Sequence, residues 1–190
     1  MTDPVERPGG NRPDSGPEWP VSESVTEYET GWYTGGYDRV EQPDGSEKRY
    51  YWAELPPAVV IVAIEADAVL FVEQYRPTIR EHCLELPAGI VEAREDYEAA
   101  ARRELEEETG RVPETTRLLQ RFDVATGVLR HERGIVLATD LTEGTRRLDD
   151  NEFLTIRRVP TEEAIELARA PPANDATLEG LMLAEYEGEL

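Results

Sequence analysis

The residues best suited to chemistry are four glutamates within five positions, in the stretch RRELEEETG at residues 102–110. The stretch has helical character and ends at Gly110, a residue typical of helix C-termini. Like charges one turn apart on a helix repel, and the negative end of the helix dipole adds to that cost. On a helix, Glu104, Glu107 and Glu108 share one face. A hard divalent cation, Mg²⁺ or Mn²⁺, would stabilise such a face, and a solvated acidic surface is the alternative.

A helix that carries these glutamates is predicted from about residue 96 to residue 109. Asp96 can cap its first turn, and the alanines at 99–101 have the highest helix propensity. Gly110 and Pro113 mark its end. The acidic face therefore belongs to one well-delimited helix that follows a loop, residues 88–95.

Strands and helices alternate around this helix. Apolar and β-branched runs predict strands at 59–64, 68–75, 83–86, 118–125, 134–141 and 152–159. A second helix is predicted to begin at Pro160 with Thr161 as its cap, and a last one to cover 177–186. Strands mixed with a few helices predict an α/β sandwich with a mixed sheet.

The chain is predicted to have three parts. Residues 1–20 are rich in Pro, Gly and Asp and lack a run of aliphatics, which is typical of a flexible tail. Residues 21–57 are rich in Thr, Tyr and Trp and contain QPDGS at 42–46, a turn signal that predicts a small antiparallel sheet. Residues 58–190 form the main α/β domain.

The composition excludes several classes of protein. The formal net charge of −21 disfavours binding to nucleic acid or to anionic membranes. Cys83 is the single cysteine, and no signal peptide or membrane-length apolar run is present, so we expect a cytoplasmic protein. Lys48 is the only lysine. An acid-rich, lysine-poor composition resembles that of halophilic proteins.

The loop and the helix together match a known motif. From Gly89 the sequence reads Gly, five residues, Glu95, seven residues, then Arg103-Glu104-Leu105, one residue, Glu107-Glu108, one residue and Gly110. This resembles the Nudix box, G-x5-E-x7-R-E-U-x-E-E-x-G-U, in which U is a bulky aliphatic residue. One position departs from it, because Arg111 occupies the last U.

The resemblance implies a hydrolase that cleaves a diphosphate linked to a nucleoside with the help of Mg²⁺ or Mn²⁺. Carried over by position, Glu104 and Glu108 are metal ligands and Glu107 is a ligand of a further ion, so that Glu104 and Glu107 belong to the catalytic machinery. The backbone carbonyl of Ala88 completes a metal site in relatives. Gly89, Glu95 and Arg103 have structural roles, the last two as an ion pair between the loop and the helix.

Two further segments resemble the ADP-ribose diphosphatase group of this family. They are VEQYRP at 72–77 and LELPAG at 84–89. The resemblance implies that Arg76 contacts the substrate diphosphate or terminal ribose and that Glu85 makes polar contacts to the substrate. A salt bridge for Arg76 and an exposed strand face for Glu85 are the alternatives.

Relatives have a glutamate after the box helix that acts as a general base or an extra metal ligand. The matching loop here is residues 126–134, and Glu132 occupies the corresponding position. Relatives usually have Pro-Gly followed by Ser-Asp-Glu in this loop, and the Pro and Ser are absent here. His131 is the rival base, because its ordinary pKa suits neutral pH. Glu132 is the preferred base.

The N-terminal sheet mediates a homodimer in this group and supplies an aromatic side chain that stacks on adenine. Trp32 and Tyr33 are the candidates here, with Trp52 a weaker one, and packing within a dimer core is the alternative role. The expected activity is hydrolysis of ADP-ribose to AMP and ribose 5-phosphate. Hydrolysis of another nucleoside diphosphate-sugar, or ADP-ribose sensing without cleavage, are the alternatives.

Overall fold

The structure, a computed structural model, describes residues 16–190, so most of the predicted tail lies outside it. Its strands are β1 (Val21–Glu29), β2 (Thr34–Glu41), β3 (Glu47–Glu54), β4 (Ala58–Glu65), β5 (Ala68–Arg76), β6 (Glu81–Glu85), β7 (Ala88–Ile90), β8 (Arg111–Asp123), β9 (Leu129–Arg130), β10 (Glu132–Glu143) and β11 (Leu154–Pro160). Its helices are α1 (Tyr97–Thr109), α2 (Thr161–Ala168) and α3 (Asp175–Tyr186).

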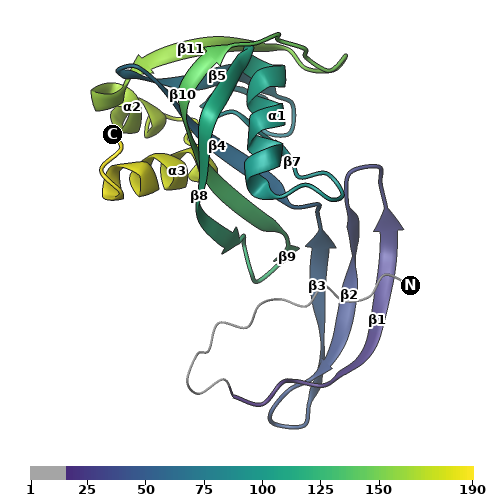
Figure 1. Ribbon diagram of the computed structural model, residues 1–190. Coiled ribbons are helices and arrows are strands. Elements are labelled where there is room, and N and C mark those ends of the chain that lie inside the picture. The colour runs from purple at the N-terminus through teal and green to yellow at the C-terminus, as the bar shows by residue number, and fades with distance from the viewer. Residues whose placement is uncertain (1–15) are drawn as a thin grey trace.

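The larger sheet has the order β11-β5-β4-β10-β8, with β6 added to β5 and β7 added to β4. It is mixed, because β4 and β10 run parallel whereas β10 and β8 are antiparallel. α1 covers one face of this sheet, and α2 and α3 cover the other (Figure 1). The predicted α/β/α sandwich is thus confirmed.

The central strand β4 supplies a hydrophobic core on each side of the sheet. Ile61 is fully buried with Leu105 of α1 on one side. Val62 is fully buried with Leu181 of α3 on the other side. Successive strand side chains point to opposite faces, so a continuous apolar run is what a strand between two helical layers requires.

The smaller sheet has the order β1-β2-β3-β9 and lies to one side of the sandwich (Figure 1). Its β2–β3 turn is the predicted one, with Gly45 at a φ of 80° that favours glycine. A Cβ on Gly36 would lie 1.9 Å from the carbonyl oxygen of Val25, so this glycine allows β1 and β2 to pair. The short strand β9 comes from the main domain and pairs with β3, so residues 21–57 do not form this sheet alone.

Several boundaries differ from the prediction. β8 begins at Arg111, well before residue 118, and includes Pro113. It is an edge strand paired with β10 alone, and an edge tolerates a residue that lacks an N–H. The predicted Thr161 cap is wrong, because α2 has Pro160 at its N-cap with no side-chain hydrogen bond. α3 begins at Asp175 because Asn174 caps it.

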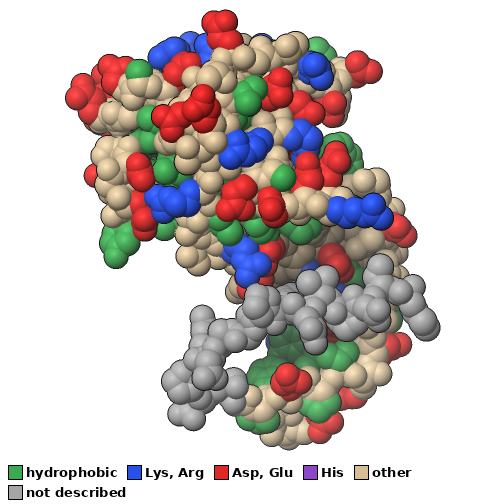
Figure 2. All heavy atoms as spheres, viewed as in Figure 1, with side chains coloured by type: hydrophobic (Ala, Val, Ile, Leu, Met, Phe, Trp, Pro, Cys, Tyr) green, Lys and Arg blue, Asp and Glu red, His purple; other side chains and the backbone are tan. Residues whose placement is uncertain are grey.

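The surface is strongly acidic, as the composition requires. Asp and Glu side chains are spread over the visible face, with a smaller number of Lys and Arg side chains between them (Figure 2). Within residues 16–190, none of the helices is long and apolar enough to cross a membrane.

Candidate active site

The helix α1 is fixed at both ends and along its buried face. The Asp96 carboxylate accepts a hydrogen bond from the Ala99 N–H at 2.8 Å. Gly110 closes the other end with a φ of 67°, the left-handed conformation of a helix-ending glycine. Leu105 is fully buried against the sheet. The glutamate face is thereby held in one orientation toward a cavity.

The cavity has a volume of about 910 Å³ and lies over the glutamate face of α1. Four regions line it: the β1–β2 turn, the end of β5, the loop around β7 with α1, and the segment before β11. Its lining residues include Trp32, Gln74, Arg76, Gly89, Arg103, Glu104, Glu107, Glu108, Arg147, Asp149, Glu152 and Phe153. Ala88 also lines it, so the predicted metal ligands all share one cavity.

Arg103 organises the carboxylates of the Nudix-box motif. Its Nε and Nη2 donate to the two oxygens of Glu95, each at 2.9 Å. Its Nη1 donates to Glu104 at 2.8 Å and to Glu107 at 3.1 Å. Nη2 also donates to the Ile90 carbonyl at 2.8 Å, so every guanidinium N–H is engaged. The ion pair of Glu95 with Arg103 is therefore present, and it joins the loop to α1.

Glu108 is the most deeply buried of the three converging glutamates, with 4% of its surface exposed. Its Oε2 accepts a hydrogen bond from the Ala88 N–H at 3.2 Å. Burial, together with the nearby charge of Glu104, raises the pKa of Glu108 to about 8. Burial also raises the pKa of Glu104, although Arg103 opposes the shift. Both carboxylates lie where a cation would be strongly favoured.

Gly89 makes room for one of these carboxylates. A Cβ at this position would lie 1.9 Å from the Cδ of Glu104. Contacts this short do not occur, so any larger residue would displace the Glu104 side chain. The motif glycine therefore keeps the loop in contact with the acidic face.

The side chains suit a divalent cation in their chemistry. They are carboxylates, the ligands that Mg²⁺ and Mn²⁺ prefer. Within residues 16–190, no three acidic, His or Cys side chains are gathered closely enough to surround one ion. Arg103 explains this, because it draws Glu104 and Glu107 toward itself. Each of these two carboxylates keeps its second oxygen outside the Arg103 hydrogen bonds.

Glu152 is a cavity carboxylate that the sequence analysis did not assign a role. It lines the cavity from the segment before β11, and its charge contributes to raising the pKa of Glu104 and of Glu108. Its Oε2 accepts from the Asp149 N–H at 3.0 Å. The acidic sequence DDNEF at 149–153, directly before β11, is the signal that could have indicated a fourth carboxylate near the helix.

The segment that carries Glu152 is attached to the C-terminal end of α1. The Arg147 N–H donates to the Glu107 carbonyl at 2.9 Å. Arg146 bridges the Glu108 carbonyl and the Leu154 carbonyl, with both hydrogen bonds at 2.7 Å. Helix ends leave carbonyls without partners, and this segment satisfies two of them. Glu152 is thus held opposite the glutamate face.

Arg76 and Glu85 form one hydrogen-bonded unit. Arg76 donates from Nε at 2.8 Å and from Nη2 at 2.7 Å to the same Glu85 oxygen. The other Glu85 oxygen accepts from Asn174 at 2.8 Å. Glu85 is buried, so the exposed strand face considered for it is wrong. Arg76 lines the cavity whereas Glu85 does not, and the structure places Glu85 as a support for Arg76.

The three aromatic candidates for stacking on a base differ in their position relative to the cavity. Trp32 lines the cavity and is 68% exposed. Tyr33 packs edge-on against Tyr28 and does not line the cavity. Trp52 donates its indole N–H to Asp38 at 3.0 Å and lies under the Arg130 guanidinium, so its ring is already occupied. Of the three candidates, Trp32 is the one that a planar base in the cavity could reach, and Tyr75 and Phe153 also line the cavity.

The two candidate bases lie outside the cavity. Glu132 accepts a hydrogen bond from the Tyr97 hydroxyl at 2.5 Å, near the opposite end of α1 from Glu108. His131 is hydrogen-bonded through Nδ1 to the Pro56 carbonyl at 2.9 Å. Burial lowers the pKa of His131 and so favours its neutral imidazole. The structure therefore does not bring the residue 126–134 loop to the box glutamates.

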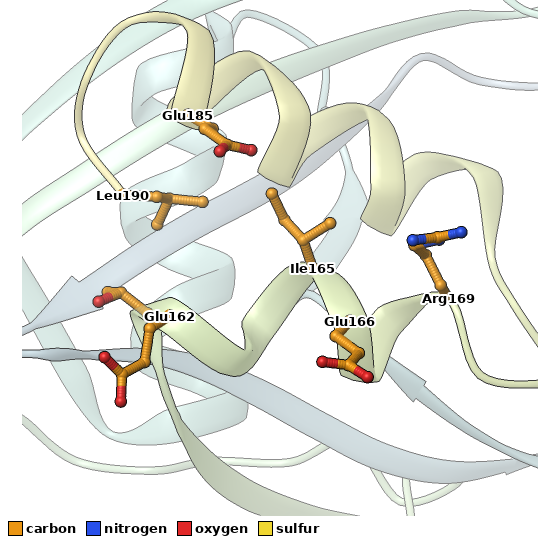
Figure 3. A pocket seen from close by; sticks show the side chains of 7 residues that line it. Glu162, Ile165, Glu166, Arg169, Glu185 and Leu190 are labelled. Carbon is orange, nitrogen blue, oxygen red and sulfur yellow. The ribbon is translucent and has the colours of Figure 1, made fainter.

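A second hollow of about 490 Å³ lies between α2 and α3. Figure 3 shows Ile165 and Leu190 inside it and the side chains of Glu162, Glu166 and Arg169 around its rim. It combines one guanidinium with scattered carboxylates and contains none of the Nudix-box residues. The candidate metal-binding glutamates instead line the cavity over α1.

Comparison with known proteins places the chain in a family. The family model described as NUDIX domain matches residues 54–181, and the chain belongs to the Nudix family. It is a Nudix hydrolase. The matched range contains the complete glutamate face, the Gly89 loop and Glu152.

Individual relatives agree with this assignment. The chain is 31% identical to the ADP-ribose pyrophosphatase of Bacillus subtilis (strain 168) over 140 residues, which covers 72% of this chain and 76% of that protein. It is 33% identical to the methanol dehydrogenase activator of Bacillus methanolicus over 132 residues, covering 68% and 71%. A crystal structure of an ADP compounds hydrolase superposes with a TM-score of 0.83 at 24% identity, covering 94% of this chain and all of that one, which supports the fold.

The raised pKa of Glu108 predicts a pH-dependent stability in metal-free protein. A carboxyl whose folded pKa is about 8 loses stabilisation as pH rises from its unfolded pKa of about 4.5 toward 8. Replacing it in Glu108→Gln removes this loss. In EDTA, we expect the melting temperature of the variant to exceed that of the wild type at pH 8.5, with a smaller difference at pH 5. If the melting temperatures of variant and wild type differ by the same amount at both pH values, the raised pKa of Glu108 is contradicted.

Proposed function

We propose that this Nudix hydrolase cleaves the diphosphate of ADP-ribose to AMP and ribose 5-phosphate with a divalent cation, Mg²⁺ or Mn²⁺. The observation that carries the proposal is one cavity that combines the glutamates of α1, an arginine at Arg76 and an exposed indole at Trp32. The similarity to an ADP-ribose pyrophosphatase supports the choice of substrate. Other nucleoside diphosphate-sugars also contain a diphosphate and a planar base, so they are the alternative substrates for this cavity.

Each part of the cavity has a role in this reaction. Glu104, Glu107, Glu108 and the carbonyl of Ala88 would hold the metal. A cation held there would supply charge neutralisation for the diphosphate and would make a nearby water more acidic. Trp32 stacks on the adenine, and Arg76, fixed by Glu85, donates to phosphate or ribose oxygens. An anionic substrate could not otherwise approach so acidic a surface.

We infer that Glu152 is the general base, because it lines the cavity and Glu132 does not. Water attacks one phosphorus of the substrate, a new P–O bond forms, and the bridging P–O bond breaks as the other phosphate leaves. A carboxylate oxygen of Glu152 takes the proton of the attacking water. Its Oε2 is oriented by the Asp149 N–H. Glu152 replaces Glu132 in this role, because Glu132 faces Tyr97 instead of the cavity.

The activity can be tested with a panel of substrates. Purified protein in high salt with Mg²⁺ would receive ADP-ribose, ADP-glucose, GDP-mannose and NADH in parallel, and products would be resolved by chromatography. We expect fastest release of AMP from ADP-ribose. Glu108→Gln should lower the rate by about 10- to 100-fold, the scale on which groups around a metal act. Faster cleavage of another compound would reject ADP-ribose as the preferred substrate.

The choice of base has its own test. Glu152→Gln keeps the shape of the side chain and removes its basicity, so kcat for ADP-ribose should fall about 10²- to 10⁴-fold. Glu132→Gln should leave kcat within about threefold of the wild type, because its partner Tyr97 lies outside the cavity. A large loss in Glu132→Gln with none in Glu152→Gln would reverse the assignment.

We also propose that the N-terminal sheet pairs with a second copy of the chain. β1 is an edge strand whose residues are exposed almost throughout. Tyr28 and Tyr51 expose 49% and 57% of their surfaces on the same sheet. An exposed edge with large apolar side chains is typical of a surface that another chain covers.

Light scattering after gel filtration tests the dimer. We expect the wild type to elute at twice the 21.4 kDa of one chain. Tyr51→Glu should shift the population toward the monomer, because a buried interface disfavours an unpaired charge. Tyr186→Glu is the control, since Tyr186 is 86% exposed on α3, away from this sheet. A monomeric wild type would reject the proposal.

A further inference from the structure

Arg147 is an arginine in the cavity to which neither the Nudix box nor the sequence analysis assigns a role. It lines the cavity from the same segment as Glu152, and its side chain is exposed. Its backbone N–H is bonded to the Glu107 carbonyl at 2.9 Å, which fixes where the side chain begins. The backbone of Arg147 is therefore anchored at the C-terminal end of the box helix, and the side chain extends from there.

The three cavity arginines differ in how many N–H donors they have left. Arg103 uses all of its donors on Glu95, two other glutamates and a carbonyl. Arg76 uses Nε and Nη2 on Glu85. Across residues 16–190, no side-chain hydrogen bond or ion pair engages the Arg147 guanidinium. Arg147 is thus the cavity arginine with its full set of donors available to a ligand.

We propose that Arg147 binds the diphosphate oxygens of the substrate and so determines substrate affinity. The inference rests on the proposed function and extends it to a residue outside the box. A guanidinium presents paired donors that match phosphate oxygens, and such charge-assisted hydrogen bonds are strong. Arg147 and Arg76 come from different elements of the cavity lining, so the diphosphate has a cationic contact from each.

Kinetics with ADP-ribose and Mg²⁺ test this role. Arg147→Gln should raise KM about tenfold to a hundredfold, the scale of a lost hydrogen bond to a charged group. It should leave kcat within about threefold, because the contact is made before and during the reaction alike. Arg147→Lys should lie between the two, since it keeps the charge and loses the paired donors.

Arg169→Gln is the matched control, because it removes the same charge from an exposed arginine in the hollow between α2 and α3. Its KM should equal that of the wild type. If Arg147→Gln gives the same KM as Arg169→Gln, the assignment is overturned. An arginine that only offsets the acidic wall would change the Mg²⁺ concentration for half-maximal activity instead of KM, and that result would also overturn it.

A binding measurement separates this inference from the proposed function. Calorimetry with the non-cleavable α,β-methylene analogue of ADP-ribose needs no turnover. Weaker binding to Arg147→Gln than to Arg169→Gln supports the role of Arg147 even if the wild type cleaves none of the panel, in which case the proposed hydrolysis alone fails. A wild type that cleaves ADP-ribose while both variants bind the analogue equally overturns the role of Arg147 and leaves the hydrolysis intact.

Discussion

The burial of the Glu108 carboxylate is the constraint on which the site depends. Its pKa is raised to about 8 because burial makes the unpaired charged form unfavourable, and a bound cation would stabilise that charged form. The surrounding structure keeps the carboxylate buried: Ala88 donates to it, and Leu105 locks α1 against the sheet. A single arginine, Arg103, holds the neighbouring carboxylates in reach. The acidic face would be unfavourable on an isolated helix and becomes useful only in this packing.

The segment before β11 forms one wall of the cavity, and it is held there by hydrogen bonds to carbonyl groups at the end of α1. The carbonyls of Glu107 and Glu108, which the helix leaves without partners, accept hydrogen bonds from this segment. The same segment carries Glu152 and Arg147. The positions of the proposed base and of Arg147 are thus linked to backbone hydrogen bonds at the end of α1. Gly110 permits this arrangement, because a Cβ there would approach the Arg146 backbone nitrogen at 3.2 Å.

The sequence predicted what is local and missed what depends on distant contacts. The α1 boundaries, the 42–46 turn and the buried strand β4 followed from caps, turn residues and apolar runs. The Nudix-box spacing predicted which glutamates share the cavity. It could not show that Glu132 turns toward Tyr97, because that pair is set by the packing of β10 against α1. Nor could it show that Glu152 faces Glu108, since the two are brought together by a hydrogen-bonded loop.

Asn174 shows how tightly one substitution can be restricted. Its Oδ1 accepts from the Thr177 N–H at 3.0 Å and caps α3, while its Nδ2 donates to Glu85 at 2.8 Å. Ser and Asp are equally good helix caps, but neither can replace an amide here. Asp would set a second carboxylate against Glu85, and a serine side chain is too short to reach both partners. The Asn174 amide therefore fixes both the start of α3 and, through Glu85, the orientation of Arg76. A substitution that disturbs one of these is expected to disturb the other.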